Sequence, residues 1–244
     1  MAGEARGLAA ERPGQRLGVS ILGVTPELAT LAWPEATEIT AFDRSRQMIE
    51  HVWPRAALPE RARAVAAEWT RLPIASGALD LVCGDGCHCL LSLPGEHRRL
   101  HAEVRRVLRP GGRFVIRAFV RPEEREGVEV IVADLRAGKI GNFHVLKWRL
   151  TMALQRSTAE GVRVADVWEA HRAIAADPAM RRFPEAVVST IDAYRGAPAR
   201  YTFPTLAELR AALAEHFTLV ACHTPGYELG ERCPTLVLRA AGCP

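Results

Sequence analysis

Several side chains that could bind a ligand follow short apolar runs of this 244-residue chain. Asp43 follows the run 38–42, Glu68 and Trp69 follow a weaker run at 62–67, and Asp85 follows the run 79–83. A carboxylate such as Asp43 can accept hydrogen bonds from two neighbouring hydroxyl groups, and an indole can stack on a flat ring. The pattern indicates a binding site. Alternatively, Asp43 could interact with the dipole of the next helix, and Trp69 could be a core residue.

Two further groups could take part in chemistry. His88 lies two residues after Gly86, which permits a sharp backbone turn, and an imidazole can take a proton near neutral pH. Asn142 and His144 lie in a later helical segment that could cover the same site. A packed histidine at 88 and a packed helix with a charged outer face are the structural alternatives.

We predict no metal site. Cys87, His88 and Cys89 lie too close together for a zinc ribbon, and no second cysteine pair follows at a suitable distance.

Apolar runs alternating with helical patterns predict an α/β fold whose parallel sheet is covered on both faces. A helix at 205–216 precedes two final strands, which we expect to form an antiparallel pair. Between the fifth and sixth strands, residues 121–199 read as a helical insertion after an N-terminal arm at 1–16. The sheet domain would comprise 17–120 and 200–244. The expected strands are 18–23, 38–42, 62–67, 79–83, 113–119, 217–223 and 235–239, and the expected insertion helices are 122–137, 143–155, 164–175 and 184–194.

Composition narrows the class of protein. The 32 basic residues exceed the 28 acidic ones by only four, and the two signs are mixed along the helices, so we expect no nucleic-acid partner. Apolar runs are all shorter than the roughly 20 residues of a membrane span, and residues 1–16 lack the apolar segment of a signal peptide. We therefore expect a cytoplasmic protein with free thiols. The sequence leaves the oligomeric state open.

Residues 68–119 carry the most specific resemblance. The motifs Asp80-Leu81-Val82, Leu108-Arg109-Pro110-Gly111-Gly112 and Phe114-Val115-Ile116 resemble strand 4, the following turn and strand 5 of class I S-adenosylmethionine (SAM)-dependent methyltransferases. The resemblance implies a Rossmann-like, seven-stranded, mostly parallel sheet with an antiparallel last strand.

The resemblance also implies roles for individual residues, with SAM as cofactor. Asp43 would bind the ribose, Met48, Glu68 and Trp69 would lie near the adenine, and Asp85 and Gly86 would approach the methionine part and the acceptor. Met48 is equally compatible with a helix core. Asp85, His88, Asn142 and His144 are the candidates for catalysis.

The first loop departs from the family pattern of an acidic residue, an apolar residue and Gly-x-Gly-x-Gly. Gly23 keeps the first glycine, whereas Ile21, Thr25 and Glu27 replace the acidic residue and the second and third glycines. Glu27 could supply the lost negative charge from another direction.

Three functions follow as expectations. The leading one is transfer of the SAM methyl group to a small-molecule acceptor. The second is cyclisation of SAM itself, with release of methylthioadenosine and a four-membered cyclic amino acid. The third is a non-catalytic scaffold with a methyltransferase-like fold, suggested by the altered first loop.

Overall fold

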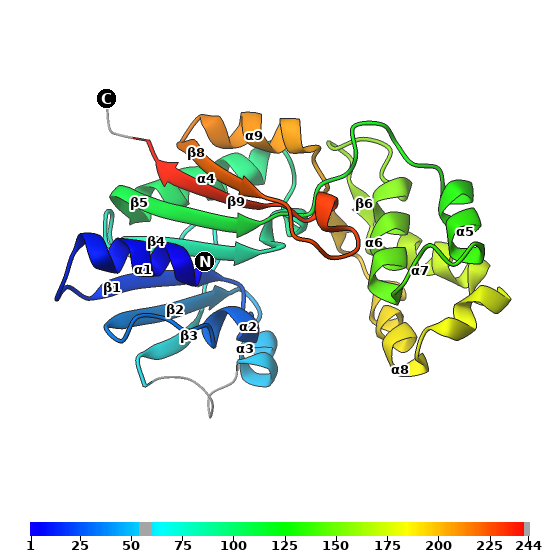
Figure 1. Cartoon of the computed structure of the whole chain (residues 1–244), viewed down its shortest axis with the longest axis horizontal. Helices are drawn as coiled ribbons and strands as arrows, with labels where there is room; N and C mark the ends of the chain where they lie inside the picture. Colours follow the sequence, from blue (N-terminus) through cyan, green and yellow to red (C-terminus); the bar gives the residue numbers. More distant parts are fainter. Residues whose placement is uncertain (54–59, 242–244) are drawn as a thin grey trace.

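The computed structural model describes residues 1–53 and 60–241. Its centre is a seven-stranded sheet in which β9 runs antiparallel to both neighbours and the other neighbouring strands pair in parallel (Figure 1). This confirms the predicted fold class, including the closing antiparallel pair. In spatial order the strands are β3 (Ala62–Ala66), β2 (Thr37–Asp43), β1 (Leu17–Leu22), β4 (Leu79–Asp85), β5 (Leu108–Arg117), β9 (Thr235–Ala240) and β8 (Phe217–His223).

Alternating side chains of the central strands enter two separate cores. In β4, Leu81 and Cys83 pack on one side of the sheet, while Val82 packs on the other. In β5, Phe114 and Ile116 share the core of Val82. Because both faces are covered, these strands are apolar at consecutive positions, which explains the unbroken runs in the sequence.

Helices cover each face. The face of Val82 is covered by α4 (Gly95–Val107) and α9 (Leu206–Ala214), which contribute Leu100 and Leu209. The opposite face is covered by α1 (Ala2–Glu11), α2 (Pro26–Ala29) and α3 (Arg46–Val52). The N-terminal arm is thus largely a helix that packs on the sheet, with Ala5 and Leu8 buried.

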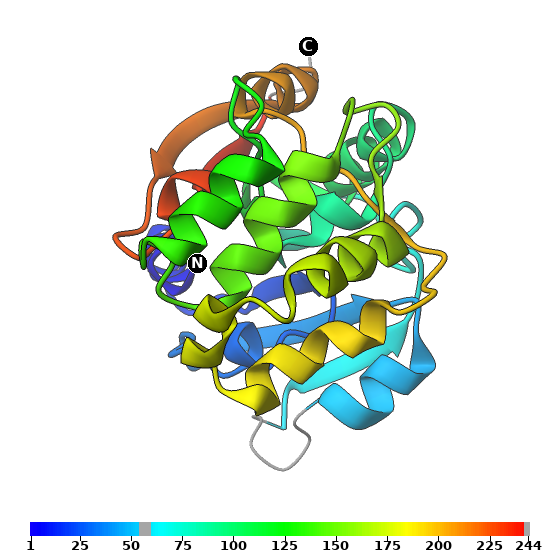
Figure 2. The same cartoon turned by 90° about the vertical axis from the view of Figure 1, so that its right-hand side faces the viewer.

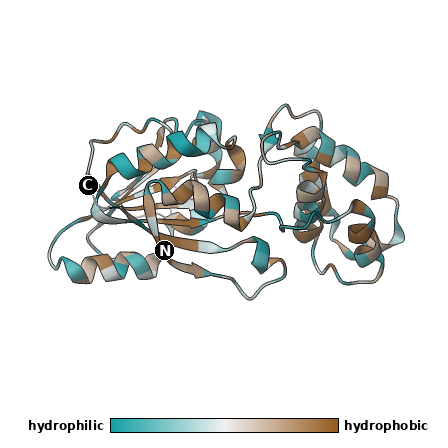
Figure 3. Ribbon diagram, turned by 90° about the horizontal axis from the view of Figure 1, so that it is seen from above, coloured by the Kyte–Doolittle hydropathy of each residue, from teal (hydrophilic) through white to brown (hydrophobic). Residues whose placement is uncertain are grey.

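A helical lobe lies beyond the carboxyl ends of the parallel strands (Figures 1 and 2). It has its own apolar core, which includes Ile131, Leu146 and Phe203. Figure 3 shows apolar positions inside both the sheet domain and this lobe. Its elements are α5 (Val128–Arg136), α6 (Phe143–Leu154), β6 (Val162–Arg163), α7 (Val164–Ile174), η3 (Pro178–Arg182), α8 (Glu185–Val188), η4 (Ser189–Tyr194) and β7 (Arg200–Tyr201).

Two predictions for the lobe were wrong in detail. Residues 122–127 are not helical, so the first lobe helix begins at Val128 rather than at 122. A two-stranded ribbon of β6 and β7, which the sequence did not indicate, extends the lobe to Tyr201.

No helix within 1–53 and 60–241 combines the length and apolarity needed to cross a bilayer. The five cysteines in these ranges are free thiols, and the prediction for Cys243 falls outside them.

Candidate cofactor site

The strand register brings the predicted ligand groups to one edge of the sheet. Leu22 of β1 pairs with Phe42 and with Gly84, which places the residues that follow all three strands side by side. Asp85 in turn pairs with Arg117 at the end of β5. Parallel strands end together, and this edge of an open α/β sheet is where ligands bind.

A cleft opens at this edge beside β2 and β3. It has about 520 Å³ of empty space, which includes space open to solvent. Its lining includes three predicted ligand residues, Asp43, Glu68 and Trp69, and two leucines from beyond β4. The full lining is Asp43, Arg44, Ala67, Glu68, Trp69, Thr70, Leu90, Leu91 and Glu96. A flat indole and two leucines beside three carboxylates suit a nucleoside.

Asp43 is held by the backbone that follows it. Its Oδ1 accepts a hydrogen bond from the Ser45 amide at 2.8 Å, and Ser45 Oγ caps α3 by accepting from the Met48 amide. One oxygen of Asp43 therefore fixes the carboxylate, while the residue still lines the cleft. Met48 is 45% exposed and does not line this cleft, so the structure does not support its predicted contact with adenine.

Trp69 forms a wall between the cleft and the first loop. Its Nε1 donates to the Phe42 carbonyl at 2.6 Å, and its ring lies 3.6 Å from where a Cβ on Gly23 would stand. Gly23 has a φ of +95°, which favours glycine. Gly23, the one glycine of the family pattern that this loop keeps, is thus favoured by the backbone conformation at that position.

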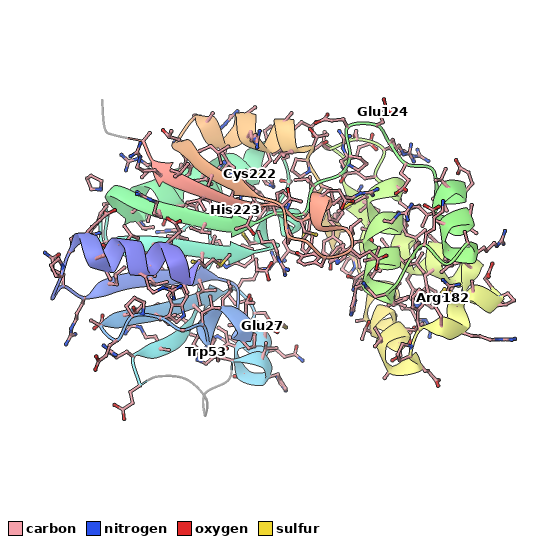
Figure 4. The ribbon with its side chains drawn as sticks, viewed as in Figure 1. Glu27, Trp53, Glu124, Arg182, Cys222 and His223 are labelled. Carbon is pink, nitrogen blue, oxygen red and sulfur yellow. The ribbon has the colours of Figure 1, made fainter. Side chains whose placement is uncertain are left out.

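The remaining first-loop residues do not line this cleft. Thr25 occupies the N-cap of α2 and Pro26 its first position, but the Thr25 side chain makes no capping hydrogen bond. Glu27, which Figure 4 labels, is exposed. It lines a second, broader hollow together with Asp85 and Arg117. Asp43, Glu68 and Trp69 therefore line one hollow, whereas Glu27 and Asp85 line another.

Asp85 is part of an ion pair that the sequence did not reveal. Arg117 donates from Nε to Asp85 Oδ1 at 2.6 Å and from Nη2 to Oδ2 at 2.7 Å, while its Nη1 donates to the Tyr227 hydroxyl at 3.2 Å. The hydrogen bond to Asp85 raises the pKa of Arg117 above its usual range, more than burial lowers it. The pair presents fixed charges of both signs at the end of β4 and β5.

Gly86 shapes the turn after this pair. Its φ is +66°, and a Cβ there would lie 2.6 Å from Cε2 of Phe119. The turn leads into η2 (Cys87–Leu90), which carries His88.

The predicted catalytic side chains do not meet. His88 is 1% exposed and lies against His101, so a base at this position is not supported, because the ring is enclosed in the core away from the cleft. Asn142 caps α6 by accepting from the Val145 amide and donates to Glu228. His144 is exposed on α6, and partial burial and the charge of Lys147 lower its pKa. Neither Asn142 nor His144 lines either hollow.

Sequence reasoning missed Arg117, Leu90, Leu91 and Glu96. Arg117 ends β5 as Asp43 ends β2 and Asp85 ends β4, but the predicted strand 113–119 ran two residues past it and hid this position. The other three reach the cleft only through the fold of η2 and the start of α4, for which the sequence carries no local signal.

Solved structures with the same fold include several methyltransferases. A SAM-dependent methyltransferase from Methanosarcina mazei is 15% identical, with 96% of each chain covered and a TM-score of 0.53. A 1,6-didemethyltoxoflavin-N1-methyltransferase from Burkholderia thailandensis, solved with bound 1,6-didemethyltoxoflavin and S-adenosylhomocysteine, is 18% identical, with 98% of this chain and 77% of that chain covered and a TM-score of 0.52. A protein from Rhodobacter sphaeroides described as a candidate zinc-dependent alcohol dehydrogenase is 14% identical, with 99% and 91% covered and a TM-score of 0.62. Likenesses this remote establish the fold alone, which is that of the class I SAM-dependent methyltransferases.

A sequence-family comparison is more specific. Residues 20–116, from β1 to β5, match the model of a family described as a methyltransferase domain. A search of the curated proteins finds no significant match. Residues 20–116 therefore resemble a methyltransferase domain, and the match covers less than half of the chain.

Proposed function

We propose that this protein transfers a methyl group from SAM to a small-molecule acceptor. The transferase activity and the cofactor follow from the methyltransferase domain at residues 20–116 and the fold around it. The observation that carries the site is the cleft in which Asp43, Glu68 and Trp69 meet after β2 and β3. Structures of this fold solved with S-adenosylhomocysteine, such as the N-methyltransferase NodS from Bradyrhizobium japonicum, support the choice of ligand.

The nucleoside of SAM would occupy this cleft. Asp43 would accept the two ribose hydroxyls with the oxygen that Ser45 leaves free, and Trp69, Leu90 and Leu91 would contact the base. Because the cleft is open to solvent, the ligand would lie along the edge of the sheet rather than inside the protein.

The amino-acid end of SAM would point past Gly23 to the second hollow. Glu27 offers a negative charge for the ammonium group, and Arg117 offers a positive charge for the carboxylate. This arrangement would replace the acidic residue that the first strand lacks, since Ile21 is fully buried.

The helical lobe would help to bind the methyl acceptor. Phe119 stacks on Trp148 of α6 with ring centroids 4.7 Å apart, and Trp148 contacts Tyr201. Methyl transfer needs the acceptor atom, methyl carbon and sulfur in line, and alignment with exclusion of water can supply most of the rate. A dedicated base is not required, in keeping with the buried position of His88. The free thiols fit a reducing cytoplasm as the setting.

Calorimetric titration with SAM tests the cofactor, and the product identifies the reaction. We expect saturable SAM binding and, with a panel of small oxygen and nitrogen nucleophiles, formation of S-adenosylhomocysteine. Methylthioadenosine formed without any acceptor would replace the proposal with the cyclase. If SAM does not bind at millimolar concentration, the remaining hypothesis is a non-catalytic scaffold.

A further inference from the structure

Three histidines form a cluster inside the sheet domain. His88 comes from η2, and His97 and His101 lie one turn apart on α4. Each is 0–1% exposed, and one ring nitrogen from each lies within 4.8 Å of those of the other two. The spacing of four residues puts His97 and His101 on the same face of a helix, as in metal sites built on helices.

Backbone carbonyls fix the tautomers of the two helix histidines. His97 Nε2 donates to the His88 carbonyl at 2.9 Å, which leaves a lone pair on its Nδ1, and this buried atom has no partner. His101 Nδ1 donates to the Ala212 carbonyl at 3.1 Å, which leaves a lone pair on its Nε2. Metal-binding histidines typically donate one ring N–H to a carbonyl and use the other ring nitrogen to bind the metal.

We propose that His88, His97 and His101 bind a divalent transition-metal ion, with Zn²⁺ favoured by the all-imidazole ligand set. Zinc–nitrogen bonds of about 2.0–2.1 Å in a tetrahedral site place two ligand nitrogens roughly 3.3 Å apart. His88 Nε2 and His101 Nε2 are 3.0 Å apart, so only a small adjustment admits the ion.

The surroundings keep solvent away from the ring nitrogens, because each of the three side chains is only 0–1% exposed. Without a metal ion, the core would enclose the unpaired Nδ1 of His97, which is unfavourable for a buried polar atom.

The bound ion would be structural, because it would fix a segment that lines the cofactor cleft. Leu90, Leu91 and Glu96 of that cleft lie between His88 and His97 in the chain. The neighbouring Cys89 packs in the core of the lobe, and its carbonyl accepts from the Thr202 amide at 2.8 Å. The three histidines would thus join the cleft wall to both cores.

Metal content of tag-free protein tests the proposal without any activity assay. Protein stripped with a chelator and dialysed should take up one Zn²⁺ or Co²⁺ per chain, measured by elemental analysis. The Co²⁺ form should show the visible absorption of a low-coordinate nitrogen site, and Zn²⁺ should raise the melting temperature of the stripped protein.

Variants locate the ion. His97→Gln should lower metal affinity by at least about tenfold, the scale seen even for loss of a supporting partner. His51→Gln and His223→Gln change exposed histidines outside the cluster and should keep full metal content. Wild-type protein that takes up no metal would overturn the proposal whether or not His97→Gln folds, and so would a folded His97→Gln protein that keeps wild-type affinity.

Discussion

Asp43 is the residue on which the cofactor assignment depends most directly. Replacing Asp43 with Ala removes the acceptor for the ribose hydroxyls and should weaken SAM binding by about 1.5–3 kcal/mol, the scale of hydrogen bonds to a charged group. That is roughly a 10- to 150-fold increase in the dissociation constant, which titration calorimetry can measure. Asp43→Asn, which can still accept from the Ser45 amide, controls for the local turn. Unchanged affinity in a folded Asp43→Ala protein would remove the cofactor assignment.

Gly86 is constrained twice, by its backbone and by a neighbour. A Cβ at Gly86 would face the left-handed φ penalty and would also meet Phe119 at 2.6 Å. Gly86→Ala should therefore lower the free energy of unfolding by more than the roughly 1–2 kcal/mol of the φ penalty alone. Gly77 has the same φ of +66° with no atom within 4 Å of the added Cβ, so Gly77→Ala isolates that penalty. If denaturant unfolding gives the same loss of free energy for both variants, then Phe119 moves aside at little cost.

At the scale of elements, sequence patterns predicted the central strands of the sheet well because these strands are buried on both faces. The run from Leu79 is apolar at successive positions for that reason, and it marked β4 clearly. Residues 122–127 were wrongly predicted to be helical, because acidic residues are typical of the first turn of a helix. Instead, Arg125 in this irregular stretch donates to the Ala153 carbonyl from Nε at 3.0 Å and from Nη2 at 2.8 Å.

The candidate site was predictable only in part, for a related reason. Residues that directly end a strand, such as Asp43 and Asp85, could be placed from strand order alone. Pairing of Asp85 with Arg117, 32 residues away, depends on side-chain direction, which no local pattern encodes. The same holds for His88 and His101, which lie on different elements and meet only in the folded core.

The start of α9 offers a test at this scale. Thr205 Oγ1 accepts from the Glu208 amide, and the Glu208 carboxylate accepts from the Thr205 amide, which completes a capping box. Thr205→Ala should lower the free energy of unfolding by about 1 kcal/mol, because the first turn loses one of its acceptors. Thr205→Ser keeps the hydroxyl and should restore most of the loss in the same denaturant titration. SAM affinity should not change, since neither Thr205 nor Glu208 lines the cleft; a Ser variant as unstable as the Ala variant would contradict the capping role.

At the scale of the whole molecule, a charged network joins the lobe to the sheet domain. Glu126, between β5 and α5, accepts from Arg149 Nε of α6 at 3.2 Å. It also accepts from Arg232 at 3.0 Å, which lies in η5 (Gly230–Arg232) between β8 and β9. Arg149 additionally bonds Asp134 of α5 at 2.7 Å. Segments from both parts of the molecule therefore converge on one partly buried carboxylate.

Loss of this charge should weaken the connection in a pH-dependent way. Burial raises the pKa of Glu126, but the hydrogen bonds and charges of Arg149 and Arg232 outweigh it and hold the pKa below its usual value. A depressed pKa stabilises the fold fully above the unfolded value of about 4.3, and this contribution is lost as the pH falls through the folded value. Glu126→Gln should thus cost about 1–3 kcal/mol at neutral pH in denaturant unfolding, and the difference from wild type should shrink below about pH 4.3. Glu124→Gln, an exposed neighbour that projects outward in Figure 4, should cost almost nothing at any pH. A Glu126→Gln loss that stays constant from neutral to acidic pH would mean that packing, rather than charge, holds the lobe to the sheet at this point.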